Sequence, residues 1–255
     1  MSDTQGYVNI EVANSIGTIE FYHPASNSLP GAILNKLADV ITEAGKDDNI
    51  KVVILRSAGD RAFCAGASFD ELVAIQDAET GLQFFSGFAK VINAMRKCPK
   101  FIIGRIHGKA VGGGVGLAAS VDYAMATEHA YVKLSELAVG IGPFVVGPAV
   151  ERKMGLSAFS ILATDATEWR SAEWAREHGL YAEVSGDTDK MDEGINELAG
   201  KLANSSPEAM AELKKVYWQG TEHWDTLLTE RAAISGRLVL SDFTRNAINK
   251  FKAKA

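Results

Sequence analysis

The chain has 255 residues, of which 47% are hydrophobic and 23% charged, a composition typical of a soluble globular protein. Its formal net charge of −6 argues against non-specific nucleic-acid binding, which requires a basic surface. The first residues show no signal-peptide pattern, and no apolar run is long enough to cross a bilayer. We therefore expect a cytoplasmic protein without nucleic-acid or membrane partners. Cys64 and Cys98 lack metal-site spacing, which indicates two reduced thiols and no metal.

The first half of the chain alternates between strand and helix patterns. Apolar and polar residues alternate over residues 8–12 and 16–21, which predicts the two strands of a hairpin. Apolar residues recur at helical spacing over residues 34–41. Residues 52–55 are continuously apolar and β-branched, as in a strand covered on both faces. After a loop at about residues 59–66, a long helical pattern runs from Leu82 to Met95.

The second half changes from mixed to helical. Residues 101–103 and 123–126 read as further buried strands, so the pattern predicts an α/β core with βαβ crossovers. The strand signal fades from about residue 155. Ser206 and Pro207 form a helix start, with an N-cap serine and proline at the first helical position. Residues 221–252 read as further helix.

Three adjacent glycines, Gly112 to Gly114, lie between the strand pattern at 101–103 and a run of small residues. The first N–H groups of a helix have no internal acceptor, and the helix dipole adds partial positive charge there. Because glycine has no side chain, a ligand oxygen can approach these donors closely. The segment therefore predicts a site for an anion or a developing oxyanion. A tight turn between a strand and a helix is the alternative, and the absence of a following Gly-Lys-Ser/Thr argues against a nucleotide P-loop.

A second glycine-containing loop, residues 62–72, follows the strand pattern at 52–55. Loops that follow neighbouring strands can converge at one end of a sheet, where each can present a backbone N–H to the same carbonyl oxygen. Thioester chemistry requires such a pair of donors, because negative charge develops on that oxygen.

These motifs together resemble the crotonase superfamily, the enoyl-CoA hydratases and isomerases. The resemblance is carried by Ala-Phe-Cys-Ala-Gly-Ala at residues 62–67 and by His-Gly-Lys-Ala-Val-Gly-Gly-Gly at residues 107–114. Leu-Ala-Thr at residues 162–164 and the segment at residues 171–180 extend it, so that it covers roughly residues 8–184.

The resemblance implies an α/β fold, a spiral of ββα units over residues 1–195 that holds an acyl-CoA site. Residues 196–255 would form a helical region for oligomerisation and site closure. The expected assembly is a homotrimer or a dimer of trimers. The expected small-molecule partner is an acyl-CoA, with the coenzyme A thioester as substrate and no cofactor.

Carried over to this chain, the family's oxyanion hole consists of the backbone N–H groups of Ala67 and Gly113. By the same resemblance, residues 65–70 would border the adenine and the pantetheine arm of CoA. Ser68 stands where relatives often have aspartate, which leaves polar contacts at that position open. Lys250 and Phe251 resemble a basic-aromatic ending that meets CoA in relatives, with a solvated helix end as the alternative. The substrate-binding positions that the resemblance implies are Ala65, Gly66, Ser68, Phe69, Asp70, Gly112, Gly116, Pro143, Phe144, Lys250 and Phe251.

The acids distinguish this chain from the family's hydratases, which use two glutamates about 20 residues apart. The first position is Gly116, which cannot transfer a proton, and the second is Glu136. Water addition uses two carboxyl groups, whereas one carboxylate can remove a proton from a carbon and return it to another carbon of the same allylic system. The Pro143–Phe144 pair is also similar to isomerase-like members. Two alternatives stay open: Glu136 is a solvated surface residue, or Glu71 replaces the missing acid.

The sequence therefore predicts an enzyme that converts 3-enoyl-CoA into 2-enoyl-CoA with Glu136 as the catalytic acid and base. Hydration of 2-enoyl-CoA is the nearest alternative, and acyl-CoA hydrolysis, decarboxylation or dehalogenation also occur among relatives. A non-catalytic acyl-CoA-binding protein is a further alternative. We interpret His107 as a packed histidine and Asp70 as a solvent-facing or helix-capping residue.

Overall fold

The computed structural model describes residues 6–252, and the side chains of residues 6–250. Its main sheet has six strands in the order β1-β2-β4-β7-β9-β11. The strands are β1 (Tyr7–Ala13), β2 (Ile16–Tyr22), β4 (Val52–Ser57), β7 (Phe101–Ile106), β9 (Tyr123–Thr127) and β11 (Glu183–Ser185). The first pair is antiparallel and every other neighbouring pair is parallel. The predicted α/β class and the predicted hairpin are both confirmed.

The hairpin turns at Asn14 and Ser15, whose φ angles are +53° and +62°. Two consecutive residues in this region form the tight loop whose twist matches that of antiparallel strands. Because the loop has only two residues, it fixes the strand register, with Ala13 opposite Ile16.

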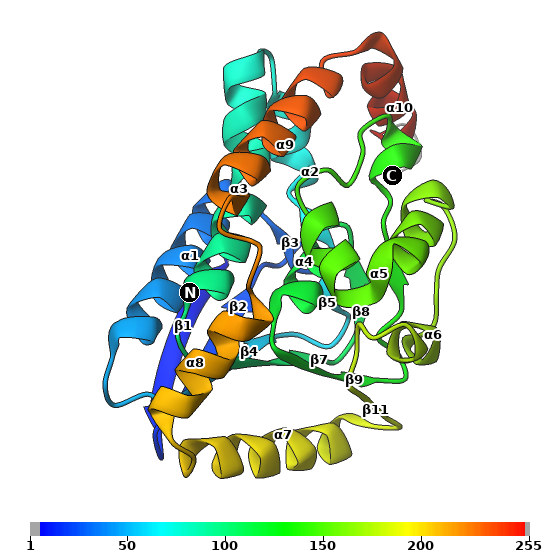
Figure 1. Cartoon of the computed structure of the whole chain (residues 1–255). Helices are drawn as coiled ribbons and strands as arrows, with labels where there is room; N and C mark the ends of the chain where they lie inside the picture. Colours follow the sequence, from blue (N-terminus) through cyan, green and yellow to red (C-terminus); the bar gives the residue numbers. More distant parts are fainter. Residues whose placement is uncertain (1–5, 253–255) are drawn as a thin grey trace.

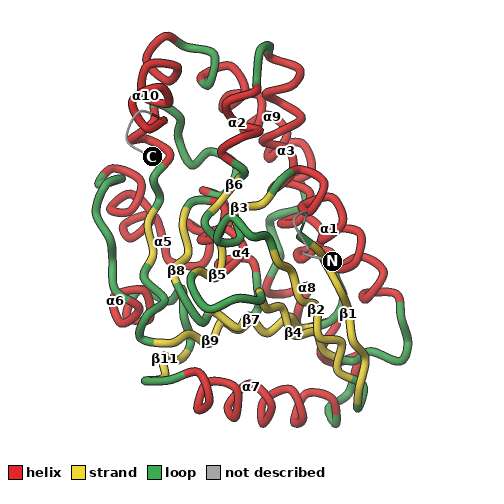
Figure 2. Tube along the Cα trace, turned by 180° about the vertical axis from the view of Figure 1, so that it is seen from behind, coloured by secondary structure: helices red, strands yellow, loops and turns green. Residues whose placement is uncertain are grey.

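Helices cover both faces of the main sheet, which explains the continuously apolar strands. Helix α7 (Thr188–Ala203) lies beneath one face in both views (Figures 1 and 2), where Met191 and Ile195 pack in one cluster with Val52 and Ile103. The opposite face belongs to a larger core that includes Val53, Leu55 and Ile102 together with residues of α1, α3 and α4. A parallel strand between two helical layers needs apolar side chains in both directions.

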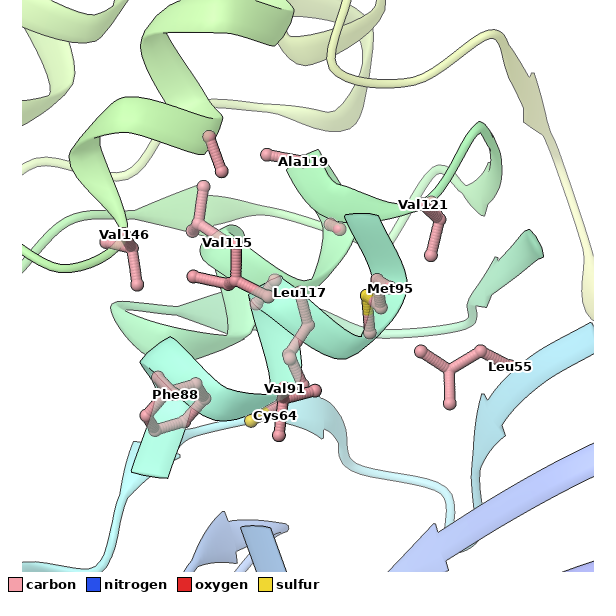
Figure 3. Packing of buried hydrophobic residues seen from close by; sticks show 14 of the residues in the cluster. Leu55, Cys64, Phe88, Val91, Met95, Val115, Leu117, Ala119, Val121 and Val146 are labelled. Atoms are coloured by element: carbon pink, nitrogen blue, oxygen red, sulfur yellow. The ribbon is translucent and has the colours of Figure 1, made fainter. Parts of the chain in front are cut away.

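The helices before residue 180 are α1 (Gly31–Lys46), α2 (Phe69–Ala74), α3 (Ala78–Lys97), α4 (Gly113–Ser120), α5 (Gly147–Thr164) and α6 (Ala172–Glu177). Helix α3 contains the predicted 82–95 pattern and begins with a capping box, in which Thr80 N–H donates to the Asp77 carboxylate at 2.8 Å. Figure 3 shows side chains of α3 and α4 meeting in the core, among them Phe88, Val91, Met95, Val115 and Leu117.

Two short sheets lie beside the main one. The first is a parallel sheet of β5 (Ala62–Cys64), β8 (Lys109–Val111) and β10 (Val132–Lys133), and the second pairs β3 (Ser28–Leu29) with β6 (Gly66–Ala67). The expected loop at residues 59–66 thus contains strand β5. A three-residue strand has too few positions to show a period of two, which is why the pattern did not reveal it.

The C-terminal third is helical apart from β11, which the sequence analysis did not expect. Helix α8 (Pro207–Tyr217) starts as predicted, with the Ser206 hydroxyl accepting from Ala209 N–H at 3.3 Å. The helical pattern at residues 221–252 divides into α9 (Trp224–Leu238) and α10 (Asp242–Lys252). The division of the chain at residue 195 into an α/β core and a C-terminal helical region stays a prediction. Residue 195 lies within α7.

Helix α9 packs closely on α3. A Cβ atom built on Gly81 would lie 2.8 Å from the Cα of Gly236, so only glycine permits this approach. None of the helices in residues 6–252 is long and apolar enough to span a membrane. The trimer or dimer of trimers implied by the family resemblance stays a prediction.

Candidate active site

A cavity of about 450 Å³ lies where α3, α4, β6, β8 and the segment 133–146 meet. Its wall is largely apolar and includes aromatic side chains from α3 and aliphatic side chains from the segment that follows β10. The lining residues are Ser28, Ala65, Gly66, Ala67, Phe69, Leu72, Phe84, Phe85, Phe88, Val111, Gly112, Gly113, Lys133, Ser135, Glu136, Ala138, Val139, Ile141, Gly142, Pro143, Phe144, Val145, Val146, Ala166, Thr167, Trp169 and Ser235. Glu136 is the one carboxylate among these lining residues.

The triglycine segment forms one wall of the cavity at the start of α4. Gly112 adopts a φ of +53°, and α4 begins at Gly113, whose N–H therefore has no acceptor within the helix. A Cβ on Gly113 would overlap the Phe88 ring, and one on Gly114 would overlap the backbone oxygen of Cys64. Glycine is thus required by close packing at both positions, and it leaves the backbone of Gly113 exposed to the cavity.

The second glycine loop meets the triglycine segment, as the sequence analysis expected. Gly66 has a φ of +94°, and a Cβ placed on it would lie 3.2 Å from Val111 O and 3.8 Å from Gly113 N. Ala67 follows immediately, and the Ser28 hydroxyl holds it by donating to the Ala67 carbonyl at 2.8 Å. Ala67 and Gly113 both line the cavity. The arrangement can offer two backbone donors to one ligand oxygen, and that role stays a prediction.

Glu136 stands opposite these glycines as the first residue of a short 3-10 helix, η1 (Glu136–Val139). Its backbone carbonyl accepts from Ile141 N–H at 3.0 Å, which closes the turn and fixes the start of η1. Its carboxylate lies against bare backbone, because a Cβ on Gly112 would be 3.0 Å from Oε1. Oε2 is buried and accepts no hydrogen bond within the described residues. Burial raises the pKa of Glu136 to about 7. The alternative of a solvated surface glutamate is therefore wrong.

The space beside Gly116, where hydratases of the family carry their first acid, is filled by Val146. A Cβ on Gly116 would lie 2.5 Å from Val146 Cγ1 and 2.7 Å from Val146 Cβ. Gly116 is buried and does not line the cavity. Glu71 does not replace the missing acid, because its Oε2 accepts from Gly31 N–H at 2.8 Å at the start of α1 and does not line the cavity.

The remaining predicted binding residues fall into two groups. Ala65, Gly66, Phe69, Gly112, Pro143 and Phe144 line the cavity. Four others do not line it: Gly116, Ser68, Asp70 and Lys250. The buried Ser68 side chain caps α2 by accepting from Glu71 N–H, and Asp70 is exposed in the first turn of that helix.

Lys250 is exposed on α10, and the Phe251 side chain lies outside the described residues. The predicted CoA contacts of these two residues stay predictions. His107 is half-buried and lies outside the cavity lining, and burial and the neighbouring Arg105 lower its pKa. This position agrees with its interpretation as a packed histidine.

Among the parts of the cavity wall that the sequence did not reveal, three are informative. Helix α3 supplies the rings of Phe84, Phe85 and Phe88, of which Phe85 and Phe88 belong to the predicted helical pattern. Ser235 reaches the cavity from α9, which nothing local in the sequence reveals. The third part is Lys133 together with Trp169. The position of Lys133, three residues before the predicted catalytic glutamate, is a sequence feature from which its place in the site could have been predicted.

Comparisons with known proteins agree with this geometry. The sequence matches the enoyl-CoA hydratase/isomerase family over residues 11–250. A Bacillus subtilis protein named "Probable enoyl-CoA hydratase" is 26% identical over 97% of this chain and 96% of its own length. Carnitinyl-CoA dehydratase of Proteus mirabilis is 28% identical over 82% of this chain and 79% of its own length. The crystal structure of enoyl-CoA hydratase from Bacillus halodurans superposes with a TM-score of 0.88, at 19% identity, over 96% of this chain and 99% of that one.

The chain therefore has the α/β crotonase fold, and an acyl-CoA substrate fits the family that its sequence matches. It belongs to the enoyl-CoA hydratase/isomerase family, as the resemblance implied.

The contact between Gly116 and Val146 predicts strong energetic coupling of the two positions. Gly116→Ala should destabilise the protein by about 1 to 3 kcal/mol, because the added methyl group overpacks the core. In a Val146→Gly background the same substitution should cost much less, since both Val146 atoms that the added methyl group would overlap, Cγ1 and Cβ, are gone. Urea denaturation of the two single variants and the double variant gives the coupling energy. An equal cost of Gly116→Ala in both backgrounds would contradict the contact.

The burial of Glu136 predicts a pH-dependent cost to folding. The Glu136 carboxyl group releases its proton near pH 4.5 in the unfolded chain and near pH 7 in the folded chain. The folded state is therefore fully stabilised by the protonated carboxyl group below pH 4.5, and this stabilisation is lost as the pH rises through 7. Glutamine at this position does not titrate, so the unfolding free energy of Glu136→Gln lacks this loss. The difference in unfolding free energy between Glu136→Gln and wild type should therefore be about 2 to 3 kcal/mol larger at pH 8 than at pH 5. Urea denaturation at both pH values measures this difference. Glu193→Gln on α7, an exposed position, is the matched control and should keep the wild-type pH dependence.

Proposed function

We propose that this enzyme shifts the double bond of a 3-enoyl-CoA to give the 2-enoyl-CoA, with Glu136 as its one proton carrier. The observation that supports this reaction is a single carboxylate in the cavity, facing the two glycine loops, with Val146 in the space beside Gly116. An isomerisation needs one group that removes and returns a proton, whereas water addition uses a second acid or base.

In the proposed reaction, the thioester carbonyl accepts hydrogen bonds from Ala67 N–H and Gly113 N–H. The Glu136 carboxylate removes a proton from C2, and the electron pair of that C–H bond delocalises over the thioester and the C3–C4 double bond. The two N–H groups stabilise the resulting dienolate, whose negative charge rests largely on the carbonyl oxygen. The Glu136 carboxyl group then gives the same proton to C4, which leaves the double bond between C2 and C3. No cofactor enters the balance.

The raised pKa of Glu136 suits this role. A carboxylate with an ordinary pKa of 4.5 is a weak base toward a carbon acid, and burial raises the value to about 7. A base whose pKa lies near the working pH combines a sufficient deprotonated fraction with a stronger affinity for the proton. The apolar wall around the carboxylate supplies the desolvation that causes the shift.

Hydration of a 2-enoyl-CoA is the second candidate, and the names of the relatives favour it. One is named an enoyl-CoA hydratase and another a carnitinyl-CoA dehydratase. For this chain, hydration requires Glu136 both to activate the water and to supply the proton that adds to the other carbon. The tight packing of Val146 beside Gly116 argues against a second acid at the position that hydratases use.

We expect the purified enzyme to convert 3-enoyl-CoA into 2-enoyl-CoA without uptake of water. Chromatography of the CoA products after incubation measures this conversion. Glu136→Gln should lower kcat/KM by about 100-fold to 10,000-fold, because it removes the only proton carrier. Glu193→Gln should leave the rate unchanged. Rapid formation of 3-hydroxyacyl-CoA from 2-enoyl-CoA would instead support hydration. Binding of acyl-CoA without any turnover would support a binding protein.

The pKa of Glu136 also predicts the pH dependence of the isomerisation. Only the carboxylate form can remove the C2 proton, so kcat/KM should rise about tenfold per pH unit below pH 7 and become constant above it. Initial rates between pH 5 and pH 9 measure the profile. A plateau that already extends down to pH 5 would contradict the proposed base.

A further inference from the structure

Two lysines share an aromatic ring at the edge of the cavity. Lys133 Nζ lies 4.4 Å from the centroid of the Trp169 ring, and Lys109 Nζ lies 4.9 Å from it. Lys133 and Trp169 line the cavity, whereas Lys109 does not. Within residues 6–252, neither lysine forms a salt bridge or a side-chain hydrogen bond. Lys133 is also the only basic residue of the cavity lining described above.

The small parallel sheet places the two lysines together. Lys133 of β10 lies in register with Val111 of β8, and Val132 with Ala110. Side chains alternate along a strand, so Lys109 and Val111 project from the same face of β8, the face that Lys133 shares. Trp169 lies in the connection between α5 and α6 and is 37% exposed. The ring keeps both ammonium groups at the edge of the cavity through cation–π contacts.

The position of Lys133 relative to Glu136 and to α2 favours the acyl side of the reacting atoms. Lys133 is three residues from Glu136, so their Cα atoms are at most about 11 Å apart. The phosphates of CoA are separated from the sulfur by the whole pantetheine arm, and the loop predicted to border that arm, residues 65–70, leads into α2. Both views show α2 and α6 on opposite sides of β8 and α5 (Figures 1 and 2). The lysines are therefore placed near the acyl group and away from the expected course of CoA.

We propose that the enzyme selects a short acyl group that ends in a carboxylate, which pairs with Lys133 while Trp169 and Lys109 support that contact. This inference rests on the proposed use of the cavity for an acyl-CoA. A purely alkyl tail would remove water from the Lys133 ammonium without offering it a partner, which is unfavourable. A carboxylate replaces that water with a charge-assisted hydrogen bond. A positively charged acyl group would be repelled by both lysines.

Binding of saturated ligands tests this specificity without any turnover. Glutaryl-CoA and pentanoyl-CoA have acyl chains of the same length and differ in the terminal carboxylate. Isothermal titration calorimetry of the full-length protein should show glutaryl-CoA binding at least about tenfold more tightly, the ordinary size of one charge-assisted hydrogen bond. Lys133→Met should remove this preference while pentanoyl-CoA binds within about twofold of wild type, which also shows that the variant is folded. Lys109→Met should reduce the preference less.

Lys36→Met on α1 is the matched control, because Lys36 is exposed and outside the site. It should keep the wild-type preference. Equal binding of the two ligands by wild type, or a preference that Lys133→Met leaves intact, would overturn the inference. An equal loss for glutaryl-CoA, pentanoyl-CoA and free CoA would overturn it too, by assigning Lys133 to the CoA phosphates. Failure of wild type to bind any of these ligands would instead refute the acyl-CoA site, and the inference with it.

Discussion

The site depends on one constraint, the contact of bare backbone with bare backbone where the two glycine loops meet. Gly66, Gly112, Gly113 and Gly114 have neighbours so close that a methyl group on any of them would have to displace a backbone atom, an aromatic ring or the carboxylate of Glu136. Through this closeness Ala67 and Gly113, which follow the two turns, line the same cavity. It also brings the carboxylate within reach of the same space, because a side chain at Gly112 would push Glu136 away.

The same closeness makes the site electrostatically demanding. The Glu136 carboxylate is enclosed by apolar groups, and one of its oxygens has no partner within the described residues. Burying an ionised carboxylate in this way costs free energy, and this cost raises the pKa of Glu136. The fold tolerates the cost because the surrounding core is large and Glu136 begins a turn fixed by its own carbonyl. The burial that lowers the stability of the folded state also makes the Glu136 carboxylate a stronger base.

Much of the fold could be predicted from the sequence, because its signals are local. The hairpin, the buried strands at β4 and β7, helix α3 and the Ser206 cap each follow from periodicity or capping within a short segment. Strands β5 and β11 did not, since three-residue strands carry no period and are formed by pairing with a distant neighbour. The convergence of Ala67 and Gly113 was predictable from the motifs. The occupation of the Gly116 space by Val146, and the use of Glu71 to cap α1, depend on tertiary packing that no local pattern encodes.

The two charged side chains of the cavity, Lys133 and Glu136, come from a single short segment, the end of β10 and the start of η1. The proposed oxyanion donors and the apolar wall come from elsewhere, from β6, α3 and α4. Because the wall belongs to the core, its residues are constrained by packing as well as by any ligand. The segment 133–136 carries less of that packing, since only Leu134 in it is fully buried. Changes in this segment can therefore alter both the proposed proton carrier and the proposed acyl preference while the fold and the two glycine loops stay the same.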